Sequence, residues 1–231
     1  MYVPAILQFL PSTHQLTSQK IFHQFFDEDF DYDTIYAQDE ILKFSNIEND
    51  TFIWAKDVII VDNNIIGYIS DYVCAKPLYQ SNPLNINLNH FSNSVIKVGK
   101  DIKIISDNGI CTYDVIYNTL YGNNGIFVID HDEYSYSNLD SLELFNKNID
   151  RFNFGIMLFL IDNYFDEFVN SYNELKEMYC SNGVNINDFI ILFRNYLNEY
   201  IGYEIIKLNE ASECLNKSKI RKKRYERILF D

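Results

Sequence analysis

The chain has 231 residues, of which 47% are hydrophobic, and it contains 18 Tyr and 18 Phe. This aromatic content excludes an intrinsically disordered chain, because it supplies enough apolar surface to offset the conformational entropy lost on folding. The formal net charge of -14 argues against specific nucleic-acid binding, which depends on Lys and Arg to neutralise phosphates.

The pattern of cysteines and of apolar runs predicts a cytoplasmic protein without a transmembrane segment. The four cysteines are widely separated and form neither a CxxC pair nor a dense framework, which fits a reducing compartment. Met1 to Leu10 lacks the basic leader of a secretory signal. The longest apolar run, Phe154 to Ile161, is much shorter than the roughly 20 residues of a membrane-spanning helix.

Residues 1–73 are expected to form a β-rich part with one helix. Strands are expected over Val3 to Leu10, Leu16 to Phe22, Asp57 to Val61 and Ile65 to Val73, and a helix over Asp33 to Asn46. Asp62-Asn63-Asn64 lies between the last two strands and is typical of a hairpin turn.

Residues 74–231 are expected to form a mainly helical part, since Pro77, Ser81, Asn82 and Pro83 break the chain near residue 74. The first helix is expected over Phe91 to Asp107, capped by Asn108-Gly109, and a hairpin over Val115 to Asp130 with its turn at Gly122 to Gly125. Further helices are expected over Phe152 to Phe165, Phe168 to Tyr179 and Ile186 to Tyr200, followed by a basic last helix. Together these patterns predict an α+β fold.

The hairpin region, residues 110–132, carries the residues best suited to chemistry. Asp114 precedes Asn118, and Asp130 and Asp132 follow the second apolar strand. Phosphoryl transfer uses one carboxylate to orient the attacking hydroxyl, and further carboxylate and amide oxygens to hold Mg²⁺ on the phosphates. The alternative for Asp130 and Asp132 is an acidic turn without a ligand.

This stretch resembles the catalytic loop and metal-binding strand of protein kinases. The resemblance implies a two-lobed kinase-like fold, with a small trimmed β-rich N-lobe and a helical C-lobe that carries the catalytic-loop hairpin. It also implies that Asp114 is the catalytic carboxylate, and that Asn118, Asp130 and Asp132 are the metal ligands. ATP and Mg²⁺ are the implied cosubstrate and cofactor.

The resemblance extends to both sides of the hairpin. Lys20 resembles the lysine that binds the phosphates, and Glu40 its helical ion-pair partner, with Asp39 as a rival for that role. The alternative for Lys20 is an ordinary surface lysine. The segment Ser70, Asp71, Tyr72 and Val73 resembles the hinge strand, whose backbone would face the adenine. Asp150 resembles the Asp that opens the central helix of the C-lobe, a position where a helix N-cap is the simpler interpretation.

Several features depart from the family pattern. Asn118 lies one position too early, and no glycine precedes Gly67, so the glycine-rich phosphate-covering loop is absent. Thr112-Tyr113 stands where His-Arg is usual. His131 takes the place of the Phe that usually follows the metal-binding Asp, and is interpreted as a packing residue, because Mg²⁺ prefers oxygen ligands.

Two classes of function stay open from the sequence. The first is an ATP- and Mg²⁺-dependent phosphotransferase acting on a protein hydroxyl or, alternatively, on a small molecule. The second is a pseudokinase, a binding or scaffold module with little or no transfer. Lys217, Lys219 and the basic run 221–224 form a candidate contact for an acidic partner, and a solvated helix end is the alternative.

Overall fold

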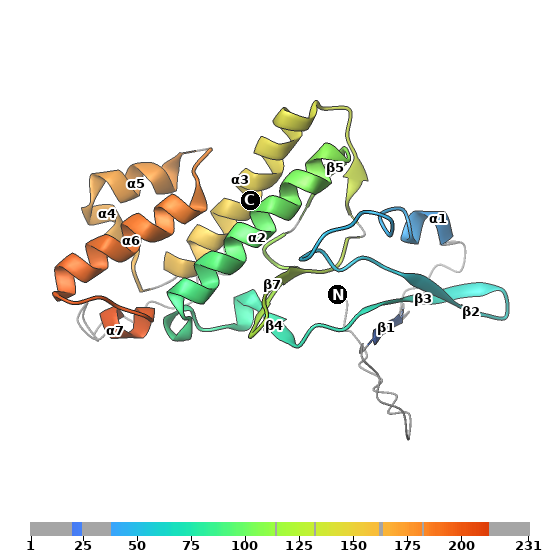
Figure 1. The fold of residues 1–231 in the computed structure, drawn as a ribbon, viewed down its shortest axis with the longest axis horizontal. Helices are drawn as coiled ribbons and strands as arrows, with labels where there is room; N and C mark the ends of the chain where they lie inside the picture. The colour runs from blue at the N-terminus through green and yellow to red at the C-terminus, as the bar shows by residue number, and fades with distance from the viewer. Residues whose placement is uncertain are drawn as a thin grey trace, which may run out of the picture.

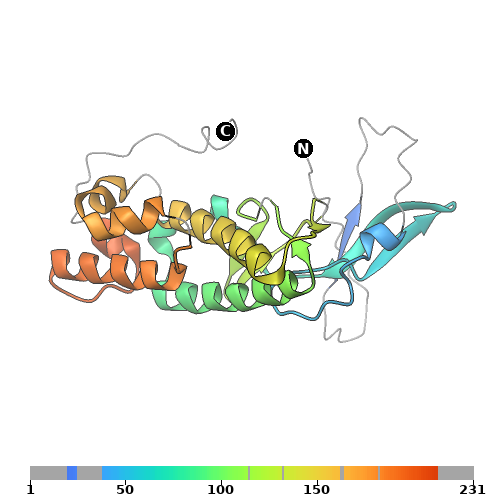
Figure 2. The ribbon, with the colours of Figure 1, turned by 90° about the horizontal axis from the view of Figure 1, so that it is seen from above.

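The computed structural model describes residues 20–24, 38–113, 115–131, 133–161, 164–181 and 183–212, with the side chains of residues 20–24 outside the description. The described part is elongated, with a β-rich end and a helical end (Figures 1 and 2). The strand expected over Val3 to Leu10 and the basic last helix lie outside the described residues.

The β-rich end is a three-stranded antiparallel sheet. It contains β1 (Lys20–Gln24), β2 (Asp57–Val61) and β3 (Asn64–Asp71), with β3 in the middle. Asp62 and Asn63 have φ angles of 49° and 66°, the left-handed values that a tight hairpin turn requires and that Asn and Asp tolerate. The predicted hairpin is therefore confirmed. The helix expected over Asp33 to Asn46 is reduced, among the described residues, to α1 (Gln38–Ile41) followed by turns.

A second small sheet links the two ends of the molecule. Its strands are β4 (Ala75–Pro77), β6 (Thr119–Gly122) and β7 (Gly125–Val128), with β6 in the middle. The first strand of the expected hairpin begins later than predicted, because residues 115–118 form turns. A short pair, β5 (Ile110–Cys111) and β8 (Ser135–Tyr136), and two 3₁₀ turns, η1 (Leu78–Gln80) and η2 (Pro83–Asn85), complete the connections.

Two long helices form the centre of the molecule, α2 (Leu88–Asp107) and α3 (Ser141–Ile161), and they lie side by side (Figure 1). The helical end adds α4 (Asp166–Ser171), α5 (Asn173–Cys180), α6 (Ile186–Ile201) and α7 (Leu208–Ser212). The expected α2 and α6 are confirmed within a few residues. The helix expected over Phe168 to Tyr179 is instead two short helices, α4 and α5.

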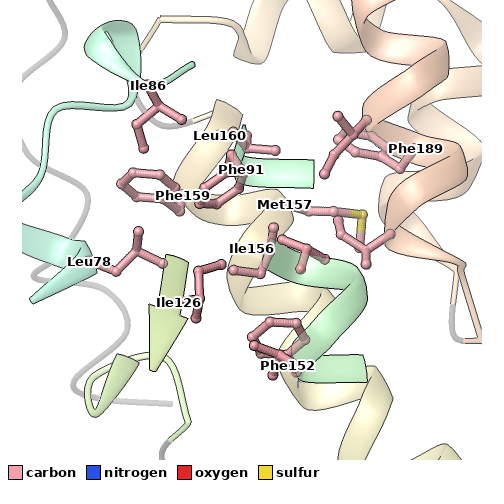
Figure 3. Packing of buried hydrophobic residues seen from close by; sticks show 14 of the residues in the cluster. Leu78, Ile86, Phe91, Ile126, Phe152, Ile156, Met157, Phe159, Leu160 and Phe189 are labelled. Atoms are coloured by element: carbon pink, nitrogen blue, oxygen red, sulfur yellow. The ribbon is translucent and has the colours of Figure 1, made fainter. Parts of the chain in front are cut away.

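One hydrophobic core joins α2, α3, α6 and β7. Phe91 of α2 and Phe159 of α3 are buried, with ring centroids 5.8 Å apart, and Ile126 of β7 is 2% exposed (Figure 3). Phe189 extends the same core to α6. Burial of a side chain of this size contributes about 1.5–3 kcal/mol, so the position of the hairpin on α2 is strongly determined.

A buried carboxylate attaches residues 50–53 to this helical core. Asp101 of α2 is 5% exposed, and its Oδ2 accepts hydrogen bonds from the backbone N–H of Thr51 at 2.8 Å and from the Thr51 hydroxyl at 2.6 Å. Phe52 then forms a parallel bridge with Val128 of β7. Contacts therefore cross the expected boundary at residue 74.

The chain is α+β, with small antiparallel sheets and several helices. Within the described ranges, no helix combines the length and the apolar character that a membrane crossing requires.

Candidate functional site

The open end of the β6–β7 hairpin brings two of the predicted metal ligands together. The backbone N–H of Ile129 donates to the carbonyl of Asn118 at 2.9 Å, which extends the strand pairing beyond Thr119 and Val128. The side chain of Asn118 then donates through Nδ2 to the carbonyl of Asp130 at 3.3 Å. Asn118 and Asp130 are thus neighbours, as the sequence predicted.

Asp130 has a left-handed backbone conformation, with φ of 60°. Such values are uncommon outside glycine, and they cluster at active sites, where the surrounding structure holds them. The next residue provides one such anchor: the His131 ring lies 4.3 Å from the Trp54 ring and 5.1 Å from the Tyr134 ring, between centroids. His131 is therefore a packing residue, as expected.

The segment that leads to Asp114 is fixed to α3 by a buried amide. Asn148 is fully buried, and its Oδ1 accepts from the backbone N–H of Thr112 at 3.0 Å and from its hydroxyl at 3.2 Å. Its Nδ2 donates to the carbonyl of Ile110 at 2.8 Å and to the Ser106 hydroxyl at 2.9 Å. One side chain therefore ties together α2, β5, α3 and the loop, with both of its polar atoms satisfied.

Two further residues of α3 continue this contact along the same helix face. The guanidinium of Arg151 donates to the carbonyl of Thr112 and lies 4.7 Å from the centroid of the Tyr113 ring. At Gly155, an added Cβ would lie 2.9 Å from Cδ1 of Ile116, so only glycine gives the loop room to lie this close. Asn148, Arg151 and Gly155 follow the spacing of one helix face.

Asp114 and Asp132 lie outside the described residues, so their predicted roles stay predictions. Among the residues that the structure describes, no three His, Cys, Asp or Glu side chains gather into a metal site. The donor types nevertheless suit Mg²⁺, which prefers carboxylate and amide oxygens. Because Asn118 uses its nitrogen toward Asp130, its Oδ1 is the atom that suits a cation.

The hinge-like segment lies at the edge between the two sheets. Ser70 is 2% exposed, Tyr72 is 37% exposed, and Asp71 forms a salt bridge with Lys56. The backbone of Asp71 pairs with that of Lys20 in the β1–β3 ladder. Val73 accepts a hydrogen bond from the backbone N–H of Ala75 at 3.0 Å. The segment therefore contacts β1 on one side and leads into β4 on the other.

The carboxylate of Glu40 forms a salt bridge with Lys43, three residues along α1. Since the Lys20 side chain is outside the description, the pairing of Glu40 with Lys20 stays a prediction.

The prediction that Asp150 opens the central helix is wrong. That helix, α3, begins at Ser141, and Asp140 accepts hydrogen bonds from the backbone N–H groups of Leu142 and Glu143, both at 3.0 Å. Asp150 lies inside the helix, where Oδ1 accepts from the backbone N–H of Gly183 at 2.9 Å. The residue of α3 that holds the loop is Asn148, two positions earlier. In the sequence, its spacing to Arg151 and Gly155 is that of one helix face. That spacing is informative only if the helix is known to include residue 148.

Comparison of the chain with protein-family models and with curated proteins gives no match.

Proposed function

We propose that this chain is an ATP- and Mg²⁺-dependent phosphotransferase with a reduced, two-lobed, protein-kinase-like fold. The observation that carries the proposal is the open end of the β6–β7 hairpin, where Asn118 and Asp130 are hydrogen-bonded neighbours beside a loop attached to α3. Positioning of this kind is the main catalytic contribution in phosphoryl transfer, since little covalent chemistry is left to the protein.

In this proposal, Asp114 accepts the proton of the acceptor hydroxyl and orients its oxygen. Asn118, Asp130 and Asp132 hold Mg²⁺, which neutralises charge on the phosphates. Lys20, oriented by Glu40, binds the phosphates, and the backbone of Ser70 to Val73 faces the adenine. The acceptor is a protein hydroxyl, as the kinase resemblance implies, with a small-molecule hydroxyl as the alternative.

A nucleotide-binding pseudokinase is the second candidate. It is favoured by the absence of any glycine before Gly67, which removes the phosphate-covering loop, and by Asn118, which lies one position too early for the usual metal ligand.

Thermal unfolding with ATP, with and without Mg²⁺, tests the nucleotide site. We expect stabilisation that requires both, amounting to about 2.7 kcal/mol when ATP is present at a hundred times its dissociation constant. Asp130→Asn removes the carboxylate charge, and Asn tolerates the left-handed backbone, so this variant is expected to lose the stabilisation by ATP and Mg²⁺. The control is Glu133→Gln, which makes the same change of charge at an exposed residue and should retain that stabilisation. An unchanged melting temperature with every nucleotide would contradict both candidates.

Transfer of labelled γ-phosphate to protein and small-molecule acceptors then separates the two candidates. We expect Asp114→Asn to lower the transfer rate by about a hundredfold or more, since a positioned general base contributes that much. Nucleotide binding without measurable transfer would identify the pseudokinase.

A further inference from the structure

A second polar cluster lies at the turn end of the β6–β7 hairpin, away from Asn118 and Asp130. It surrounds a cavity of about 810 Å³ between the hinge-like segment, the hairpin turn and the start of α2. The polar lining includes Lys76, Lys207, His90, Tyr121, Asn85 and Asn123, and no Asp or Glu. A lining without acids is unexpected in a chain with a formal net charge of -14.

The β4–β6 pairing places one lysine beside Tyr121. Lys76 is directly opposite Tyr121 in the antiparallel ladder, and opposite residues project from the same face of a sheet. The Tyr121 ring lies against α2, at 5.7 Å from the His90 ring and 5.3 Å from the Phe91 ring. Lys76 therefore projects toward the same helix.

A hydrogen bond connects His90 and Tyr121, with Nδ1 of the histidine 2.9 Å from the tyrosine hydroxyl. Burial raises the pKa of Tyr121, so this hydroxyl remains protonated and can donate to Nδ1. In that arrangement the proton of the neutral imidazole is on Nε2, which is then the donor that His90 offers to a ligand.

The second lysine, Lys207, lies just before α7, far from Lys76 in the sequence. Lys207 forms an antiparallel bridge with Asn87, the N-cap of α2, and the backbone N–H of Leu88 donates to the carbonyl of Ile206 at 2.9 Å. The start of α2 adds the partial positive charge of a helix N-terminus.

The carboxylates nearest to Lys207 in the sequence have other partners. Glu204 pairs with Arg194 at 2.8 Å, and Glu210 accepts from the backbone N–H groups of Ile206 and Lys207. In the described ranges, neither Lys76 nor Lys207 forms a salt bridge. No carboxylate of the described residues therefore competes with a ligand for either ammonium group.

Gly122 shapes the cavity at the hairpin turn. An added Cβ there would lie 2.5 Å from the carbonyl oxygen of Cys74, so the close approach of β6 to residues 74–75 requires glycine. This approach keeps Lys76 and Tyr121 in one wall.

We propose that this cavity binds a small organic phosphate. Lys76 and Lys207 neutralise the phosphate and the Nε2–H of His90 donates a hydrogen bond to it, while the amides of Asn85 and Asn123 bind hydroxyl groups. The volume lies within the roughly 300–1,000 Å³ range of small-molecule sites. This proposal does not use Asn118 or Asp130, but Tyr72 of the hinge-like segment, which the proposed function places near the adenine, also lines the cavity.

Titration of the full chain with ribose 5-phosphate and glucose 6-phosphate, which carry no adenine, tests the site in the absence of Mg²⁺. Inorganic phosphate and citrate serve as the two comparison ligands. We expect both organic phosphates to bind more tightly than either comparison ligand, and backbone amide NMR signals of Lys76, Gly122 and Asn123 to shift. Calorimetry gives the dissociation constants.

Variants assign the binding to the cavity. Lys76→Gln and Lys207→Gln should each weaken binding by about tenfold, because each removes a charge-assisted contact to phosphate. Lys100→Gln, an exposed lysine of α2, has the same change of charge and should leave binding unchanged. Asp130→Asn should also leave it unchanged, which distinguishes this site from the Mg²⁺–ATP site.

Three outcomes would overturn the proposal. They are no binding of either organic phosphate, equally tight binding of citrate, and equal effects of Lys76→Gln and Lys100→Gln.

Discussion

The two ends of the β6–β7 hairpin carry opposite chemistry. The open end has the oxygen donors Asn118 and Asp130, and the turn end has Lys76 and Lys207 around His90 and Tyr121. A strand of 4 residues separates them, about 13 Å at 3.3 Å per residue. The two sites proposed for this hairpin therefore differ because its two ends have different neighbours.

Different elements and different interactions fix the position of each end of the hairpin. The open end depends on α3, through the buried hydrogen bonds of Asn148 and the contact of Gly155 with Ile116. The turn end depends on β4 and on the start of α2, through strand pairing and the bridge from Asn87 to Lys207. Substitutions of Asn148 or Gly155 should therefore affect the open end more than the turn end.

The largest effect is expected from Asn148→Ala. It leaves the buried N–H of Thr112 and the buried carbonyl of Ile110 without their partner, at a cost of about 3 kcal/mol in the free energy of unfolding. The proposed Mg²⁺-dependent response to ATP should be lost, while the proposed binding of organic phosphate should be retained in the folded protein. Chemical denaturation and calorimetry measure the two effects.

The matched control is Asn146→Ala, an exposed asparagine of the same helix, which should change stability by less than about 0.5 kcal/mol. Equal loss of both ligand responses in folded Asn148→Ala would mean that the two ends are not separately held.

A smaller effect, about 2 kcal/mol, is expected from Asp101→Ala, because it removes a buried, charge-assisted hydrogen-bond acceptor of Thr51. Residues 50–53 should detach from α2 and from Val128 of β7, which lies close to the open end. Hydrogen exchange of the Thr51 amide should then become faster. The exposed neighbour Lys100→Ala should leave that exchange rate unchanged, and a protected Thr51 amide in Asp101→Ala would contradict this assignment.

The smallest effects are expected from two glycines in the middle of the long helices, and they should have opposite signs. Gly155→Ala should destabilise the chain by about 1–2 kcal/mol, because its Cβ would displace Ile116 and the loop. At Gly99 an added Cβ would meet only Cδ1 of Ile149, at 3.7 Å, so Gly99→Ala should stabilise by about 0.5–1 kcal/mol through helix propensity. Melting temperatures compare the two, and a stabilising Gly155→Ala would show that the loop does not need this space.

Local patterns in the sequence predicted several elements well. The hairpin turn at Asp62 and Asn63 follows from the tolerance of these residues for positive φ, and the end of α2 at Asn108-Gly109 follows from the same preference. The adjacency of Asn118 and Asp130 follows from strand pairing around a glycine turn. Each depends on residues close together in the chain.

Other features could not be predicted, because they depend on contacts between distant segments. The start of α3 was placed too late, since Asp150 was interpreted as the residue that opens the helix and the helix was expected from Phe152, whereas α3 begins at Ser141 and includes the buried Asn148. Tertiary structure gives this amide four partners from α2, β5 and the loop, which offsets the cost of burying it. The cavity at the turn end likewise combines residues from positions 76, 90, 121 and 207.

The sequence by itself determined the α+β composition, most of the hairpins and helices, and the presence of oxygen donors around one hairpin, because these follow from side-chain periodicity and turn chemistry. Only the tertiary structure decided which polar residues hold that hairpin and that Lys76 and Lys207 line one cavity. Those outcomes depend on burial, and burial is set by how α2, α3 and the chain near residue 207 pack together.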